Sequence, residues 1–169
     1  GCIQLSNAHN LTSNQISSVS LRVHPLVIEL TGKPAPQTGL EAKFSIYHAS
    51  AAAIVRRSAG PNEFTDAVVQ DSEVIALRDK VTARIDESVS EEEAFVSITL
   101  TDGTVLDTHI EHAIGSLERP MTREALEEKF ADQARTTLPM AQINDVMTLC
   151  WNIEALDDVS EIAQASVPA

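Results

Sequence analysis

The chain has 169 residues, of which 43% are hydrophobic and only 4% are aromatic, and its formal net charge is −13 at neutral pH. This composition excludes a disordered chain and supports one folded domain of ordinary size or slightly more, with a core of Val, Ile, Leu and Ala. The negative charge argues against nucleic acids and anionic membrane surfaces as partners, because binding to either depends on clustered Lys and Arg.

The first residues are typical of the end of a helix. In GCIQLSNAHNL, the apolar residues Ile3, Leu5 and Leu11 indicate the tail of an amphipathic helix. We interpret residues 1–16 as the remnant of a preceding helical segment, so that the chain is a piece of a longer protein. A tag scar or a processed start is the alternative explanation for a chain that begins at Gly1.

Residues 17–118 are predicted to form an α+β domain. Val19, Leu21 and Val23 alternate with polar residues, and this period of two predicts a strand with one buried face. A helical turn, a loop, a long apolar helix and two short helices are predicted next, over residues 26–32, 33–39, 42–57, 61–71 and 72–81. The last helix has Asp71 or Ser72 as its N-cap.

The alternation returns in the second half of this domain. It predicts a strand over residues 80–88 and a hairpin over residues 94–113, with Asp102-Gly103 as the turn. The glutamate run between them is predicted to be a solvated loop. We therefore expect a small domain of antiparallel strands packed against helices.

Residues 119–169 are predicted to be helical throughout. Pro120 ends the preceding segment, Thr122 can cap the first helix, and Leu126 and Phe130 lie at helical spacing. A segment this short is a poor candidate for independent folding. We expect it to pack on a helical domain that this chain does not contain.

The usual catalytic and metal-binding motifs are absent. The sequence has no glycine-rich phosphate loop, no GxSxG and no CxxC, and Cys2 and Cys150 lie near opposite ends. In HIEH, His109 and His112 would face opposite sides of a strand, so we expect two surface histidines and no metal site. No apolar run approaches the roughly 20 residues of a membrane helix, and no signal peptide is visible. A reducing, cytoplasmic setting is the simplest expectation.

Lys43, Tyr47 and His48 are the candidate site residues. Histidine titrates near neutrality and can take a proton from carbon next to a carboxylate, and lysine can hold a carboxylate or a developing anion. On one continuous helix, however, positions 43 and 48 would lie about 140° apart around the axis. The alternative is a solvated Lys43 at a helix start and a satisfied His48 at the edge of the core.

Four motifs in order resemble the C-terminal half of the MmgE/PrpD family. They are GLEAKFSIYHASAAAIV, FTDAVVQDSEVIALRDKV, ITLTDGTV and PMTREALEEKF. Their order and spacing are more specific than any one of them. The family includes 2-methylcitrate dehydratase, cis-aconitate decarboxylase and iminodisuccinate epimerase, and its members pair a large helical domain with a smaller α+β lid.

The resemblance implies a function and a site. A lysine and a histidine five residues apart at the start of the lid helix map onto Lys43 and His48, whereas the other polar site residues lie in the helical domain. The resemblance implies proton transfer without metal or organic cofactor, on a small di- or tricarboxylate, and a homodimer. Tyr47 is the chain's only tyrosine and does not lie where the aromatic hydroxyl of the lid is expected.

We therefore expect this chain to be the C-terminal part of a cofactor-independent lyase or isomerase, which would be a dehydratase, a decarboxylase or an epimerase. The isolated chain is expected to be inactive. Lys43 and His48 are the expected catalytic residues, and Lys43, His48 and Tyr47 the expected substrate contacts. The alternative is a non-catalytic α+β module for metabolite binding or dimerisation. Family members with different products share these motifs, so the substrate and the reaction outcome stay open.

Overall fold

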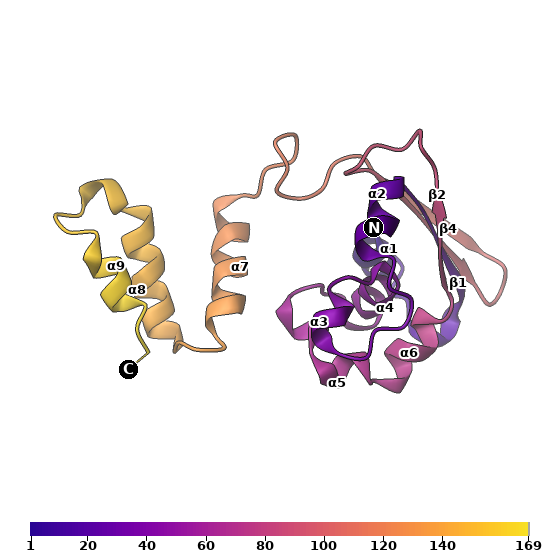
Figure 1. Ribbon diagram of the computed structural model, residues 1–169, viewed down its shortest axis with the longest axis horizontal. Helices are drawn as coiled ribbons and strands as arrows, with labels where there is room; N and C mark the ends of the chain where they lie inside the picture. The colour runs from indigo at the N-terminus through magenta and orange to yellow at the C-terminus, as the bar shows by residue number, and fades with distance from the viewer. Residues whose placement is uncertain (169) are drawn as a thin grey trace. The chain divides into compact units, whose positions relative to one another are not determined.

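The structure is a computed structural model that describes residues 1–168. It divides into two compact units, with the boundary between Arg119 and Pro120. Each unit is described by itself (Figure 1).

The first unit has a run of helices between its first and second strands, and its last three strands follow one another in the chain. Its elements are α1 (Cys2–Ala8), η1 (Ser13–Gln15), β1 (Ile16–Val23), α2 (Pro25–Thr31), α3 (Gly39–Ala42), α4 (Ile46–Arg56), η2 (Pro61–Phe64), α5 (Asp66–Val69), α6 (Ser72–Arg78), β2 (Val81–Ile85), β3 (Ala94–Leu100) and β4 (Val105–Ile110). The predicted α+β class is confirmed.

The strands form one mixed sheet in the order β2-β1-β3-β4. β3 and β4 form the predicted hairpin, with Gly103 at φ +89° in its turn, and β3 also pairs antiparallel with β1. β2 pairs parallel with β1, which the period of two could not reveal because alternation is the same in both orientations. The helices between β1 and β2 form the crossover that a parallel pair requires.

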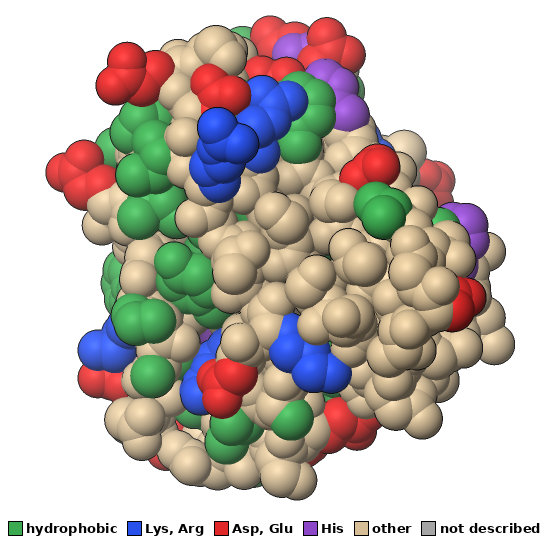
Figure 2. Space-filling view, turned by 90° about the vertical axis from the view of Figure 1, so that its right-hand side faces the viewer, with side chains coloured by type: hydrophobic (Ala, Val, Ile, Leu, Met, Phe, Trp, Pro, Cys, Tyr) green, Lys and Arg blue, Asp and Glu red, His purple; other side chains and the backbone are tan. Residues whose placement is uncertain are grey.

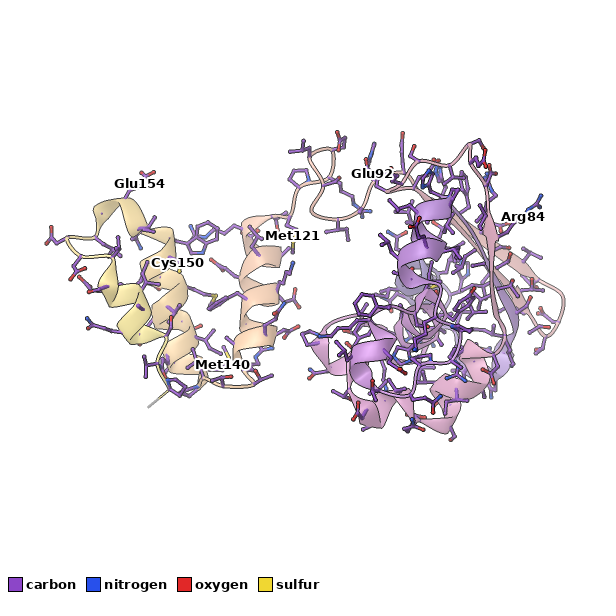
Figure 3. The ribbon with its side chains drawn as sticks, viewed as in Figure 1. Arg84, Glu92, Met121, Met140, Cys150 and Glu154 are labelled. Atoms are coloured by element: carbon purple, nitrogen blue, oxygen red, sulfur yellow. The ribbon has the colours of Figure 1, made fainter. Side chains whose placement is uncertain are left out.

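One face of the sheet is packed against helices and the other is open. Val19, Val23 and Ile98 are buried on the packed face, where α1, α4 and α6 contribute Leu5, Ile54, Val74 and Leu77 among others to the same apolar cluster. The opposite face carries Ser20 and Arg84, which are exposed. Figure 2 views the open side, where polar uncharged side chains and backbone predominate, and Arg84 points away from the sheet in Figure 3. The predicted one-sided burial of β1 is confirmed.

The predicted continuous helix over 42–57 is wrong. It is divided into α3 and α4 by a turn at Lys43 and Phe44, because Ser45 is in an extended conformation and caps α4. The Ser45 hydroxyl accepts a hydrogen bond from the His48 N–H at 3.1 Å. The predicted helix over 61–71 is likewise divided at Thr65, which caps α5, whereas Asp71 caps α6 as predicted.

The second unit is helical, as predicted. It contains α7 (Arg123–Ala134), α8 (Met140–Trp151), η3 (Ile153–Ala155) and α9 (Ser160–Ala165). The Thr122 side chain caps α7 by accepting the Ala125 N–H at 3.2 Å. Figure 3 marks Met140 at the start of α8 and Cys150 near its end. Within the described residues, no helix of either unit is long and apolar enough to cross a bilayer.

The second unit buries little of its apolar surface. Ile143 and Val146 of α8 are buried, but Leu126 and Phe130 of α7 and Trp151 of α8 are 43%, 38% and 43% exposed. These three line a crevice with Met147 and Cys150. The unit thus presents an apolar surface that its own helices leave uncovered.

Candidate functional site

Lys43 lies in the turn between α3 and α4. The turn is fixed by the Lys33 N–H, which donates to the Phe44 carbonyl at 3.1 Å, and by a β-bridge between Gly32 and Ser45. Because Lys43 precedes the cap of α4, the separation of about 140° expected for one continuous helix does not apply. The side chain of Lys43 is exposed.

Lys43 is also a free cation, unlike its neighbour Lys33. The Lys33 ammonium lies 2.9 Å from Glu41 Oε1. A hydrogen bond from the Gln37 N–H and then the Lys33 ammonium hold the pKa of Glu41 below its ordinary value. No carboxylate within residues 1–168 lies within ion-pair distance of the Lys43 ammonium. The Lys43 charge is therefore available to an anionic ligand.

His48 lies in the first turn of α4 and has no exposed surface. Its Nε2 is 2.9 Å from the carbonyl oxygen of Glu63, and its ring meets the Phe64 ring at a centroid distance of 5.7 Å. Its Nδ1 is buried and has no hydrogen-bond partner in the described part of the chain. Thus one ring nitrogen of His48 has a hydrogen-bond partner and the other has none in the described residues. A buried polar atom without a partner is uncommon enough to require an explanation.

Tyr47 has a different environment from His48. It is partly buried and packs against the main apolar cluster of the first unit. Neighbouring residues on a helix project about 100° apart, so Tyr47 and His48 occupy different sides of α4. The structure does not bring the Tyr47 side chain onto the buried ring of His48.

Sequence reasoning missed Glu63, which lies against His48. The residue is 9% exposed, and its carboxylate accepts the Gly60 N–H at 2.8 Å and the Ser58 hydroxyl at 3.0 Å. The signal was present in GPNE, where a glutamate three residues after the cap position can accept the backbone N–H of that position, which is one half of a capping box. The contact of its carbonyl with His48 has no sequence signal, because the two residues are 15 positions apart.

The two histidines of HIEH each approach a glutamate. His109 Nε2 is 2.6 Å from Glu93 Oε1, and His112 Nδ1 is 3.4 Å from Glu92 Oε1. The prediction that both lie on one strand is wrong, because β4 ends at Ile110. Glu92, His112 and Glu118 bring ligand atoms within 4.8 Å of one another, a set that could hold a metal ion. Both glutamates are exposed, and exposed acidic groups cluster in this way without a metal.

Comparisons with known proteins cover most of the chain. The family model of the MmgE/PrpD C-terminal domain matches residues 1–153. The chain is 28% identical to a mitochondrial 2-methylcitrate dehydratase of Yarrowia lipolytica over 151 residues, which cover 80% of the chain and 28% of the relative. It is 23% identical to a cis-aconitate decarboxylase of Mus musculus over 158 residues, which cover 90% of the chain and 32% of the relative. The chain thus spans less than a third of the length of these relatives. The family expected from the motifs is confirmed: the chain belongs to the MmgE/PrpD family and corresponds to its C-terminal domain.

Proposed function

We propose that this chain is the C-terminal part of a cofactor-independent lyase or isomerase that transfers a proton at carbon next to a carboxylate of a small di- or tricarboxylate. Family membership supports the reaction class, because the two relatives are named a dehydratase and a decarboxylase. Both names describe reactions of small carboxylates in which a proton is removed from or added to carbon.

One observation carries the site assignment. An exposed lysine lies in the turn before α4, and the first turn of that helix holds a buried histidine. Within residues 1–168 the lysine has no acidic partner and one ring nitrogen of the histidine has no hydrogen-bond partner. A buried polar atom without a partner requires an explanation, and a catalytic role is one that suits a histidine. Proton abstraction beside a carboxylate needs a cation for the carboxylate and a base for the proton, and Lys43 and His48 are residues of these two kinds.

In this proposal Lys43 holds a substrate carboxylate and His48 exchanges the proton. Tyr47 is a secondary substrate contact. Because the His48 ring has no exposed surface in this chain, catalysis requires a conformational step that brings substrate to Nδ1. The residues that cover the ring include Glu63 and Phe64, which lie in the short helix η2.

The rest of the site is proposed to come from a helical domain elsewhere in the protein. The relatives are more than three times as long as the matched segment, and the second unit exposes Leu126, Phe130 and Trp151. We propose that these side chains pack on that domain, that the intact protein is a homodimer in the cytoplasm, and that this chain alone is inactive. Two free cysteines fit a reducing setting.

The experiment is a substrate screen of the intact protein with 2-methylcitrate, cis-aconitate and iminodisuccinate. Turnover of one of them, lost in Lys43→Ala and in His48→Gln, would support the proposal. Absence of turnover with all three, or full activity in both variants, would contradict it.

A non-catalytic module for metabolite binding or dimerisation is the second candidate. The complete burial of His48 favours it, because a histidine enclosed in the core can serve packing alone. Such a module would be stabilised against heat by a polycarboxylate without turning it over, or would dimerise without any ligand.

A further inference from the structure

The hydrogen bond between His48 and Glu63 fixes which ring nitrogen carries the proton. The partner of Nε2 is a backbone carbonyl at 2.9 Å, and a carbonyl oxygen can only accept. Nε2 must therefore be the protonated nitrogen. In the neutral ring this leaves Nδ1 with a free lone pair, and Nδ1 is also the buried atom without a partner.

The carbonyl that sets this tautomer is itself held in place by the side chain of the same residue. Glu63 Oε2 accepts both the Gly60 N–H at 2.8 Å and the Ser58 hydroxyl at 3.0 Å, and these bonds close the η2 turn. Glu63 as a whole residue is 9% exposed. Glu63 Oε1 has no partner within residues 1–168, so one oxygen carries both bonds.

The chain beyond Glu63 is anchored to the element that leads to Lys43. The Gly39 N–H at the start of α3 donates to Asp66 Oδ1 at 2.6 Å. A Cβ at Gly39 would lie 2.0 Å from the Phe64 carbonyl oxygen, so the two backbones are in close contact. The Glu63 carbonyl is thus fixed on one side by its own carboxylate and on the other by α3.

We propose that Glu63 is a positioning residue that holds His48 in the Nε2–H tautomer, so that Nδ1 is the nitrogen that exchanges a proton with the substrate. This inference rests on the proposed function of His48. Glu63 acts through its backbone carbonyl on Nε2, and its carboxylate fixes the turn that presents the carbonyl. The proton that Nδ1 accepts from substrate carbon makes the ring an imidazolium, and Nδ1 returns it to the carbon or to a leaving hydroxyl.

The test is the tautomer of His48 in the intact protein, read from nitrogen chemical shifts after selective ¹⁵N-histidine labelling and assigned by comparison with His48→Gln. The Nε2–H tautomer is expected at neutral pH. Glu63→Ala removes both side-chain bonds, so mixed tautomers are expected, together with a loss of up to about a hundredfold in kcat/KM because the base is misplaced. Glu63→Gln is the matched control, because its amide oxygen can accept both bonds, and it should keep the tautomer and the activity.

Three results would overturn the inference: an Nδ1–H tautomer in the unmodified protein, an unchanged tautomer in Glu63→Ala, or a loss in Glu63→Gln equal to that in Glu63→Ala. If Glu63→Ala does not fold, Ser58→Ala decides, because it removes one of the two bonds and should shift the tautomer in the same direction by less. The proposed function can fail separately from this inference. It fails if the unmodified protein shows the Nε2–H tautomer of His48 but the His48→Gln variant keeps full kcat/KM.

Discussion

At the residue scale, Ser45 explains both the break in the predicted helix and the position of the candidate base. Its hydroxyl accepts the His48 N–H, so the cap that starts α4 also fixes the backbone of His48. The sequence contained this signal, since serine is a preferred N-cap residue. The apolar spacing from Ala42 to Ile46 nevertheless continues across the break and predicts a single helix.

Ser45→Ala should lower the free energy of unfolding by about 1 kcal/mol, because the buried cap is lost and the His48 N–H is left unsatisfied. Urea denaturation of the chain measures this change. Ser45→Thr keeps the hydroxyl and is the control. Equal stability of Ser45→Ala and the unmodified chain would show that the cap does not hold the start of α4.

Asp86 is the residue for which the structure gives a dependence of stability on pH. Hydrogen bonds from the Ser88 hydroxyl at 2.6 Å and from Arg22 at 2.8 Å hold the pKa of Asp86 well below its ordinary value. A carboxyl whose pKa is lowered on folding stabilises the protein above its unfolded pKa of about 3.9, and this contribution is lost as the pH falls further.

Asp86→Asn should therefore lower the melting temperature at neutral pH, and its difference from the unmodified chain should shrink below about pH 4. Thermal unfolding at several pH values measures this difference. Asp107→Asn is the control, because no cation within residues 1–168 forms an ion pair with Asp107. If the difference in melting temperature between Asp86→Asn and the unmodified chain is the same at neutral pH and below pH 4, the lowered pKa of Asp86 does not stabilise the fold.

At the element scale, the site depends on the contact between α3 and the segment that follows η2. The alternation and turn signals predicted β1 and the β3–β4 hairpin, because these are local patterns. The parallel pairing of β1 with β2 and the contact of His48 with Glu63 join residues far apart in the sequence. Such contacts form when the elements pack together, and no local pattern in a single sequence indicates them.

Gly39→Ala should destabilise the first unit by about 1–3 kcal/mol, because the new Cβ would lie 2.0 Å from the Phe64 carbonyl oxygen and the backbones must separate. Denaturant unfolding measures the loss. Gly60→Ala is the matched control in the same region, since its Cβ would meet no atom closer than 3.6 Å. If both variants are equally stable, the close approach of α3 to Phe64 does not exist.

At the scale of the whole molecule, the apolar surface of the second unit agrees with the length of the relatives. Composition and periodicity predicted its helices, but they could not show which side chains remain exposed. Packing on a further helical domain would cover Leu126, Phe130 and Trp151. Burial of such side chains is favourable by about 25 cal/mol for each Å² of apolar surface removed from water.

Backbone hydrogen exchange tests this packing. Amides of α7 and α8 should exchange more slowly in the intact protein than in this chain, because docking suppresses local opening. Peptides from the β3–β4 hairpin should change less, since those strands are already paired within the first unit. Equal exchange rates of α7 and α8 in both proteins would contradict the proposed contact.

The most direct test of the central claim is kcat/KM of the intact protein with its best carboxylate substrate after substitution of the candidate pair. His48→Gln should lower kcat/KM by roughly 10² to 10⁴ because general acid–base catalysis is lost, and Lys43→Ala should also lower it because the carboxylate loses its cation. Lys33→Ala is the matched control: it removes a nearby lysine that is paired with Glu41 and keeps the backbone bond to Phe44, so activity should be retained. Unchanged kcat/KM in both His48→Gln and Lys43→Ala would contradict the account.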